Sequence, residues 1–237
     1  MNKTDDFSTA RLNMVRDQIA ARGVRDPLVL EAMRGVPREK FVPSNLQKYA
    51  YDDEPLPIGS DQTISQPYIV AYMIEALELQ GGETVLDIGT GSGYAAAVLS
   101  QIAGVVYSLE LIEELAIRAR KLLQDLHYQN VHVKQGDGTL GWPEHAPFDA
   151  IVVAAGGPRV PNSLKTQLKI GGRMVIPVGS GANAQRLARI VRISETEYET
   201  RYIAHVRFVP LLGKEGWNSE DKPSKLRSLL DPFYKPM

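Results

Sequence analysis

The stretch "VLDIGTGSGYAAAVLS", residues 85–100, passes from an apolar run through a glycine-rich turn into an alanine-rich segment. The apolar run predicts a buried strand, and the alanine-rich segment predicts the beginning of a helix. Gly89, Gly91 and Gly93 allow a tight turn and a close approach of the backbone to a ligand, because glycine has no Cβ atom. This unit predicts an α/β fold with a ligand bound at the turn.

The chain around this unit alternates between apolar runs and amphipathic segments. We expect buried strands at residues 84–89, 105–111, 131–137, 148–156 and 173–179. We expect helical segments between them at about 93–103, 111–126 and 160–169. Such alternation is typical of a doubly wound α/β fold, in which helices cover both faces of a mostly parallel sheet.

Both ends of the chain depart from this pattern. Residues 186–211 alternate over two long runs around residues 195–199, which predicts an antiparallel β-hairpin. Residues 9–35 predict two helices with a break between Gly23 and Pro27. A further helix is expected from about Pro67, because proline is well tolerated in the first turn.

Composition narrows the class of protein. The 237 residues are enough for one sizeable core, and a net charge of −1 gives no field that would favour nucleic acid or anionic membrane. The chain has no cysteine, and its four histidines lack metal-ligand spacing, so we expect no metal site. No apolar run approaches a membrane span, and the charged N-terminus does not resemble a signal peptide. We therefore expect a cytoplasmic protein.

Three acids stand at the ends of successive predicted strands. Asp87 precedes the glycine turn, where it suits an ammonium group better than a pyrophosphate, and Tyr94 replaces the third glycine of a dinucleotide fingerprint. Glu110 follows at about the distance at which an acid accepts hydrogen bonds from ribose hydroxyls. Asp137 could accept a hydrogen bond from an adenine amino group.

An ammonium, a ribose and an adenine together describe S-adenosylmethionine. Two alternatives remain open from these residues. The glycines could merely pack a strand against a helix, or the same crevice could hold the nucleotide of a nicotinamide or flavin enzyme.

Further motifs flank this cofactor half. "LPIGSDQTISQPYIVAYM" (56–73), "VPREKFVP" (36–43) and "VRFVPL" (206–211) resemble the protein-L-isoaspartate O-methyltransferase family, from about residue 14 to residue 213. The resemblance implies methyl transfer from S-adenosylmethionine, with S-adenosylhomocysteine as product, to the α-carboxylate of isoaspartyl residues in damaged proteins. The ester then collapses to a succinimide. A non-enzymatic module that binds S-adenosylmethionine and recognises damaged chains is the alternative.

The resemblance also implies a fold and a domain plan. The sheet would be a Rossmann-like methyltransferase sheet of seven strands, with an antiparallel C-terminal hairpin and N-terminal helices. A single methyltransferase domain would span residues 1–213. Its parts would be N-terminal helices at 1–55, a substrate or lid loop with its helix at 56–80, and the cofactor-binding sheet and hairpin at 81–213. Residues 214–237 would form a loosely packed extension.

A carboxylate substrate is already an anion at neutral pH, so its attack needs orientation and removal of water, not a general base. Small hydroxyl groups suit that task. The resemblance makes Ser65 the catalytic residue, and makes Thr63, Ile64, Gln66 and Val209 substrate contacts. The alternative for Thr63 and Ser65 is that they cap the helix that begins near Pro67.

We assign cofactor binding to residues of the glycine turn and of the three strand ends: Asp87, Gly89, Thr90, Gly91, Gly93, Glu110, Asp137 and Gly138. Isoaspartyl proteins and peptides are the expected partners, without nucleic acid or membrane, and the protein is expected to be a monomer. One residue departs from the family pattern. Asp61 stands in "GSDQT" (59–63) where a glycine is usual, and it either faces solvent or alters the site.

Overall fold

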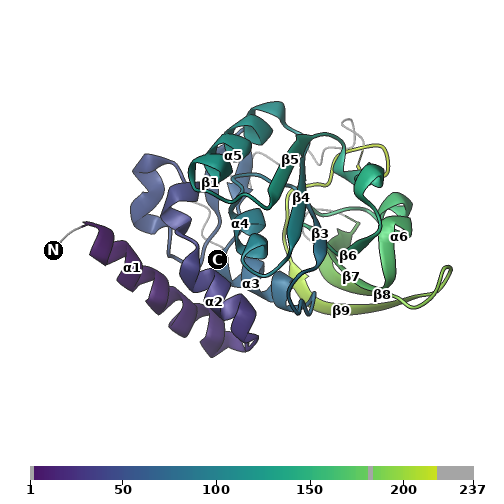
Figure 1. Ribbon diagram of the computed structural model, residues 1–237, viewed down its shortest axis with the longest axis horizontal. Coiled ribbons are helices and arrows are strands. Elements are labelled where there is room, and N and C mark those ends of the chain that lie inside the picture. Colours follow the sequence, from purple (N-terminus) through teal and green to yellow (C-terminus); the bar gives the residue numbers. More distant parts are fainter. Residues whose placement is uncertain (1–2, 181–183, 218–237) are drawn as a thin grey trace.

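A seven-stranded sheet runs through the computed structural model, which describes residues 3–180 and 184–217 (Figure 1). In spatial order the strands are β5, β4, β3, β6, β7, β8 and β9. Their bounds are β3 (Thr84–Ile88), β4 (Val105–Glu110), β5 (Val131–Gln135), β6 (Phe148–Val153), β7 (Leu168–Gly179), β8 (Gln185–Arg192) and β9 (Tyr198–Val206).

The five strands from β5 to β7 are parallel, whereas β8 and β9 each run antiparallel to the preceding strand. The predicted mostly parallel sheet with an antiparallel C-terminal hairpin is confirmed. The chain builds outward from β3 to β4 and β5, and then crosses back to β6 on the other side of β3. Ligands of doubly wound folds bind at such a switch point, beyond the carboxyl ends of the strands.

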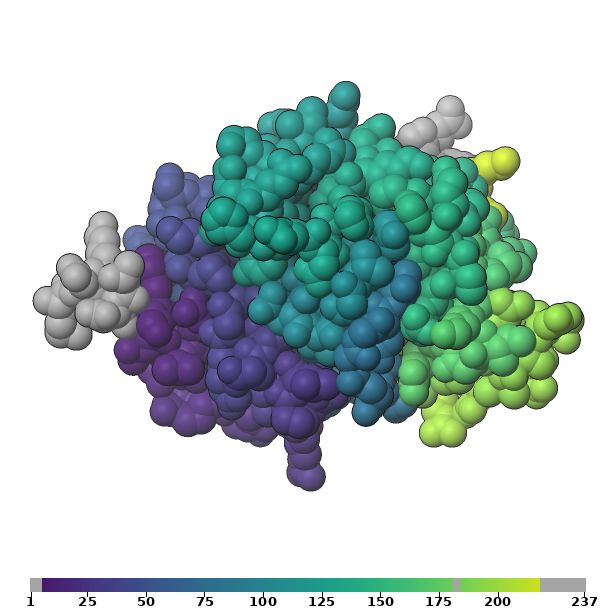
Figure 2. Space-filling model, in the orientation of Figure 1, coloured from purple at the N-terminus to yellow at the C-terminus, as the bar shows by residue number. Residues whose placement is uncertain are grey.

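Two hydrophobic cores lie on opposite faces of the sheet, because successive residues of a strand point to opposite faces. Val85 belongs to the core that the N-terminal helices and α3, α4 and α5 cover. Leu86 belongs to the second core, with Phe148, and α6 covers it. The helices are α1 (Lys3–Asn13), α2 (Pro27–Gly35), α3 (Pro67–Glu75), α4 (Tyr94–Ser100), α5 (Glu113–Asp125) and α6 (Asn162–Gln167). The N-terminal helices and the C-terminal hairpin form opposite ends of the molecule (Figure 2).

The predicted break in the N-terminal helices is present. After α1 the chain continues through a π-helical turn at Met14–Ile19 and a short 3-10 turn at Ala20–Arg22, which ends at Gly23 with φ +103°. Asp26 then caps α2, because its carboxylate accepts a 2.8 Å hydrogen bond from Leu28 N. Pro27 occupies the first turn, where its missing N–H leaves no backbone acceptor unsatisfied.

Residues 56–64 form a small hairpin where a loop was expected. Strand β1 (Leu56–Gly59) pairs antiparallel with β2 (Gln62–Ile64). Ser60 and Asp61 connect the two strands, and both have positive φ, at 52° and 55°. A two-residue turn with two left-handed residues matches the natural twist of a hairpin. The hairpin leads directly into α3.

Strand β9 ends at Val206, so the predicted hairpin over residues 186–211 is wrong for its last five residues. The Gln185 side chain accepts a 2.7 Å hydrogen bond from Phe208 N and donates a 3.1 Å bond to Phe208 O. Gly156 N donates to Val209 O at 2.7 Å, which brings this segment to the end of β6. The backbone of residues 207–212 therefore bonds to a side chain and to a loop instead of to a neighbouring strand.

The expected domain boundary after residue 213 does not mark the end of the packed chain. Lys214 N donates a 2.8 Å hydrogen bond to Asp137, and Trp217 Nε1 donates a 2.9 Å bond to Gly156 O. Residues 214–217 therefore pack on the sheet domain. The remainder of the expected extension, residues 218–237, lies outside the described residues.

Candidate functional site

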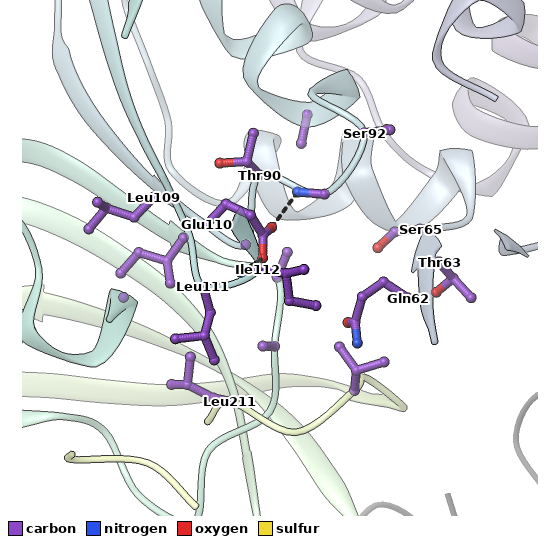
Figure 3. Close-up of a pocket in the computed structure, with 18 of the residues that line it drawn as sticks. Gln62, Thr63, Ser65, Thr90, Ser92, Leu109, Glu110, Leu111, Ile112 and Leu211 are labelled. Carbon is purple, nitrogen blue, oxygen red and sulfur yellow. Dashed lines mark hydrogen bonds between the residues drawn. The ribbon is translucent and has the colours of Figure 1, made fainter. Parts of the chain in front are cut away.

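A cavity opens at the carboxyl ends of β3, β4 and β6, and we call it the first cavity. Its walls come from the β2 hairpin strand, the glycine loop at 89–92, the end of β4 and the segment 209–212. Figure 3 shows Gln62, Thr63 and Ser65 on one side and Glu110 on the other. This position is the switch point of the sheet, where the fold predicts a ligand.

The glycine loop is shaped by left-handed residues. Gly89 and Gly91 have φ of 93° and 53° and line the first cavity. A Cβ atom on Gly91 would lie 3.3 Å from Ile58 Cδ1, so glycine lets the loop pack closely against the hairpin. Gly93 has a different role, because a Cβ atom on it would lie 3.2 Å from Leu123 Cδ1 of α5. Gly93 thus permits close packing of the loop against α5.

Glu110 ends β4 with its side chain only 6% exposed. Its Oε2 accepts a 2.8 Å hydrogen bond from Gly91 N, drawn in Figure 3, and its Oε1 accepts a 2.9 Å bond from Ile112 N. Two backbone donors therefore fix the carboxylate on the cavity wall. Each oxygen keeps a lone pair, so the carboxylate can accept two further hydrogen bonds, as from a pair of ribose hydroxyls.

Asp87 is fully buried beneath the glycine loop. Its Oδ2 accepts a 2.6 Å hydrogen bond from Ser108, and Ser108 Oγ lies 2.6 Å from Thr90 Oγ1. Within the described chain its Oδ1 has no hydrogen-bond partner. Burial, with the nearby charge of Glu110, raises the pKa of Asp87 to about 6 against the opposing effect of the Ser108 hydrogen bond.

Asp137 makes its hydrogen bonds within the protein. Its Oδ1 accepts bonds from Thr139 N at 2.9 Å and Thr139 Oγ1 at 2.7 Å, and its Oδ2 accepts from Lys214 N. Gly138 lines the first cavity, and a Cβ atom on it would run into Ile88 Cγ2. Of the described residues that line this cavity, none is Asp87, Gly93 or Asp137.

A second cavity adjoins the first. Thr63, Ser65, Ala154 and Val209 line both cavities. Gln66 and Asp61 line the second alone, together with residues 205–208. Ile64 lines only the first cavity. The structure therefore brings together all of the expected substrate contacts and Ser65 around the junction between the cavities.

Ser65 does not cap α3, and Asp53 satisfies the helix terminus in its place. Asp53 Oδ1 accepts a 3.0 Å hydrogen bond from Tyr68 N, and its Oδ2 accepts a 2.6 Å bond from the Gln66 side chain. The alternative in which Thr63 and Ser65 act as helix caps is therefore wrong. Among residues 3–180 and 184–217, neither hydroxyl has a hydrogen-bond partner. Both are thus available to a ligand.

Sequence reasoning missed several lining residues. Gln62 and Ser92 lie within the quoted motifs, so their positions in the chain could have identified them. Ala154 and Leu212 come from segments that only the topology brings together, and no local pattern marks them. In the described part of the chain, no cluster of three or more acidic or histidine side chains is suited to a metal ion. No described helix is long and apolar enough to cross a membrane.

Comparisons with known proteins agree on one family. The family model of protein-L-isoaspartate(D-aspartate) O-methyltransferase matches residues 10–216. Protein-L-isoaspartate O-methyltransferase 1 of Rhodopseudomonas palustris (strain HaA2) is 60% identical over 227 residues, which is 93% of each chain. Protein-L-isoaspartate O-methyltransferase 2 of Marinobacter nauticus is 61% identical over 218 residues, which is 92% of this chain and 100% of the relative.

Two solved structures share the fold. A protein-L-isoaspartate O-methyltransferase structure has a TM-score of 0.78 at 31% identity, and the match covers 87% of this chain and 67% of the other. A Plasmodium falciparum protein in complex with S-adenosyl-L-homocysteine has a TM-score of 0.72 at 23% identity, over 85% of this chain and 98% of the other. The second match supports the fold alone.

Proposed function

Because the chain belongs to the protein-L-isoaspartate O-methyltransferase family, we propose that its two adjoining cavities bind the two reactants of one reaction. The enzyme methylates the α-carboxylate of L-isoaspartyl residues in damaged proteins, with S-adenosylmethionine as methyl donor, and so begins repair through a succinimide. We assign the cofactor to the first cavity and the isoaspartyl residue to the second. The shared wall of Thr63, Ser65, Ala154 and Val209 carries this assignment.

The residues of the first cavity suit S-adenosylmethionine. Gly89, Gly91 and Gly138 line this cavity without side chains that would cover their backbone groups. Glu110 would accept hydrogen bonds from the ribose hydroxyls, with its orientation fixed by Gly91 N and Ile112 N. Gly89 and Thr90 would contact the cofactor through the loop. When bound, the cofactor supplies a methyl group on a positively charged sulfur.

Two of the assigned acids, Asp87 and Asp137, would influence the cofactor without touching it. Asp87 is buried behind the loop and would favour the ligand ammonium by its negative charge, whose effect is stronger in a buried, poorly solvated setting. Asp137 holds Thr139 and Lys214, so we assign it to the shape of the adenine end more than to a direct contact. Gly93 contributes by allowing the loop to pack against α5.

The substrate carboxylate would lie at the junction of the cavities. Ser65 and Thr63 offer hydroxyl donors that are free of intramolecular hydrogen bonds in the described structure. A hydroxyl can hold one carboxylate oxygen and leave the other directed at the methyl group without adding a charge. Apolar residues around them, such as Ile64 and Val209, exclude water, which favours attack of an anion on a cation. We assign Gln66 to the substrate side of the junction.

Other parts of the proposal rest on the sequence. We propose one methyltransferase domain that includes the packed residues up to Trp217. A monomer in the cytoplasm, without nucleic acid or membrane partners, is the expected state. Size-exclusion chromatography with light scattering and cell fractionation would test it. No observation favours a binding module that lacks the enzymatic activity.

A matched pair of peptides tests the function. One peptide carries isoaspartate and the other carries aspartate at the same position. Isoaspartate adds one methylene to the main chain and presents its α-carboxylate on a short branch, so one set of contacts cannot align both. We expect base-labile methyl ester on the isoaspartyl peptide and essentially none on the aspartyl peptide. Equal rates would indicate a different carboxyl methyltransferase, and binding of S-adenosylhomocysteine without ester formation would indicate a binding module.

A further inference from the structure

Residues 213–217 fold back on the segment that lines the first cavity, and we call them the clasp. Gly216 N donates a 3.1 Å hydrogen bond to Gly213 O, and Trp217 N donates a 2.9 Å bond to Leu211 O. The clasp directly follows residues 209–212, which line the first cavity. Its position therefore fixes where that part of the wall can lie.

Glu215 attaches the clasp to two other elements. Its carboxylate accepts hydrogen bonds from Ser163 N at 3.0 Å and from Ser163 Oγ at 2.5 Å, at the beginning of α6. Its backbone N donates a 3.1 Å bond to Thr139 Oγ1. Burial acts to raise the pKa of Glu215, but the hydrogen bonds from Ser163 outweigh it and hold the pKa below the usual glutamate value.

Two further bonds join the clasp to the carboxyl ends of strands. Lys214 N donates to Asp137 Oδ2, just after β5, and Trp217 Nε1 donates to Gly156 O, just after β6. Gly156 also accepts a 2.9 Å hydrogen bond from Leu211 N. The clasp thus bridges two strand ends that lie on either side of the sheet's switch point.

The clasp fits so closely that side chains are excluded at two positions. A Cβ atom on Gly213, where φ is +145°, would run into the Asp137 carboxylate. A Cβ atom on Gly216 would run into Leu211 O. Both contacts are with groups that hold the cavity wall, so the clasp and the wall are packed as one unit.

We propose that the clasp positions the wall segment 209–212 and that Glu215 is its anchoring residue. Val209 lines both cavities, whereas Leu211 and Leu212 line the first. Without Glu215 these residues lose their fixed place, so the cofactor and the substrate each bind less tightly. Glu215 touches neither reacting group and is a positioning residue. The inference rests on the proposed function in assigning cofactor and substrate to the two cavities.

The test compares Glu215→Ala with Glu215→Gln, Ser163→Ala and a control, Glu197→Ala. Glu197 lies in the turn between β8 and β9, and its side chain makes no hydrogen bond or ion pair within the described chain. For each variant, calorimetry gives the Kd of S-adenosylhomocysteine, kinetics give KM and kcat on an isoaspartyl peptide, and unfolding gives the thermal midpoint.

We expect Glu215→Ala to raise both the Kd and the peptide KM about tenfold, with kcat at saturation changed by less than about threefold. Glu215→Gln keeps one acceptor, and Ser163→Ala keeps the backbone donor, so both should show smaller increases. Trypsin should cleave after Lys214 faster in Glu215→Ala than in the control.

A lower thermal midpoint with unchanged Kd and KM would overturn the proposal and leave Glu215 with a role in stability alone. If Glu215→Ala does not fold, Glu215→Gln and Ser163→Ala decide the question by the same measurements. The two inferences fail in different ways. Absence of methyl ester with the wild-type enzyme contradicts the proposed function, whereas the Kd of S-adenosylhomocysteine tests the clasp without any turnover.

Discussion

Ser108 joins Asp87 to the wall of the first cavity. Its hydroxyl donates a 2.6 Å hydrogen bond to Asp87 Oδ2, so its remaining contact, 2.6 Å from Thr90 Oγ1, is one in which Thr90 donates. Thr90 lines the cavity and Asp87 lies behind it. Asp87, near the end of β3, is therefore linked to the glycine loop through the hydroxyl groups of Ser108 and Thr90.

The burial of Asp87 predicts that the free energy of unfolding depends on pH. The pKa of Asp87 is about 6 in the folded protein, above its ordinary value of 3.8, chiefly because the carboxylate is buried. The folded state therefore favours the protonated acid. The preference of the folded state for protonated Asp87 contributes fully to the free energy of unfolding below about pH 4. This contribution is lost as pH rises to about 6, and it is absent at higher pH. In Asp87→Asn the dependence should disappear.

Urea unfolding of the wild type and Asp87→Asn between pH 4 and pH 8 measures this effect. The wild type should lose up to about 3 kcal/mol relative to the variant across that range, the equivalent of two pKa units. The comparison cancels contributions of other groups that titrate equally in both proteins. Parallel curves for the two proteins would show that Asp87 has an ordinary pKa in the fold.

Glu110 should control cofactor affinity. If Glu110 accepts hydrogen bonds from the ribose hydroxyls, Glu110→Ala removes bonds to a charged group that are worth roughly 1.5–3 kcal/mol. We expect S-adenosylhomocysteine to bind about 10- to 100-fold more weakly. Glu110→Gln is the matched variant, because it keeps the size and one acceptor oxygen, and it should lose less. Calorimetric titration with unchanged affinity in Glu110→Ala would remove Glu110 from the site.

Local patterns predicted most of the sheet, because burial of parallel strands leaves continuous apolar runs. They failed where pairing depends on distant residues. Strand β7 begins at Leu168 and not at residue 173, since Leu168 pairs with Phe148 across a register shift. The apolar pattern predicted that the strand continues through residues 207–211, yet the Gln185 side chain bonds the Phe208 backbone.

Some residues of the site were predicted correctly and others were not, again because some contacts join segments that are distant in sequence. Ser65 and Glu110 occur in motifs whose neighbours in sequence are also neighbours in space, so their places near the cavity could be inferred. Asp87 and Asp137 have the expected positions in the chain, but burial and internal hydrogen bonds direct their carboxylates away from the cavity lining. Such details depend on packing between segments that are remote in sequence. The Glu215 anchor depends on the same kind of packing and had no signal in the sequence.

Ser65 should affect turnover and not folding. If its hydroxyl orients the attacking carboxylate, Ser65→Ala should lower kcat on an isoaspartyl peptide at least about tenfold, with the Kd of S-adenosylhomocysteine nearly unchanged. The thermal midpoint should also stay unchanged, since Ser65 does not cap α3. Asp53→Ala provides the opposite case, because it removes the cap and should destabilise the protein by about 1 kcal/mol. Wild-type kcat in Ser65→Ala would exclude the catalytic role.

Asp61 stands where the resemblance leads us to expect glycine, and its surroundings limit what the difference can do. Its φ of 55° lies in the left-handed region, which aspartate tolerates better than most residues. The turn is also held from outside, because Arg118 donates a 3.1 Å hydrogen bond to Ile58 O of β1. The aspartate therefore keeps the shape that glycine would allow.

Charge is the remaining difference, because Asp61 lines the second cavity and could repel a carboxylate substrate. The residue is exposed, however, and solvent and salt screen an exposed charge strongly. We therefore expect Asp61→Gly to keep its activity, with KM changed by less than about threefold. Glycine adds freedom to the turn, so subtilisin should cleave near residues 59–62 faster than in the wild type. Steady-state kinetics at low and high salt, with the digestion followed by mass spectrometry, check both effects. A collapse of activity in Asp61→Gly would make Asp61 a functional residue of the site, with a role that the glycine of its relatives cannot supply.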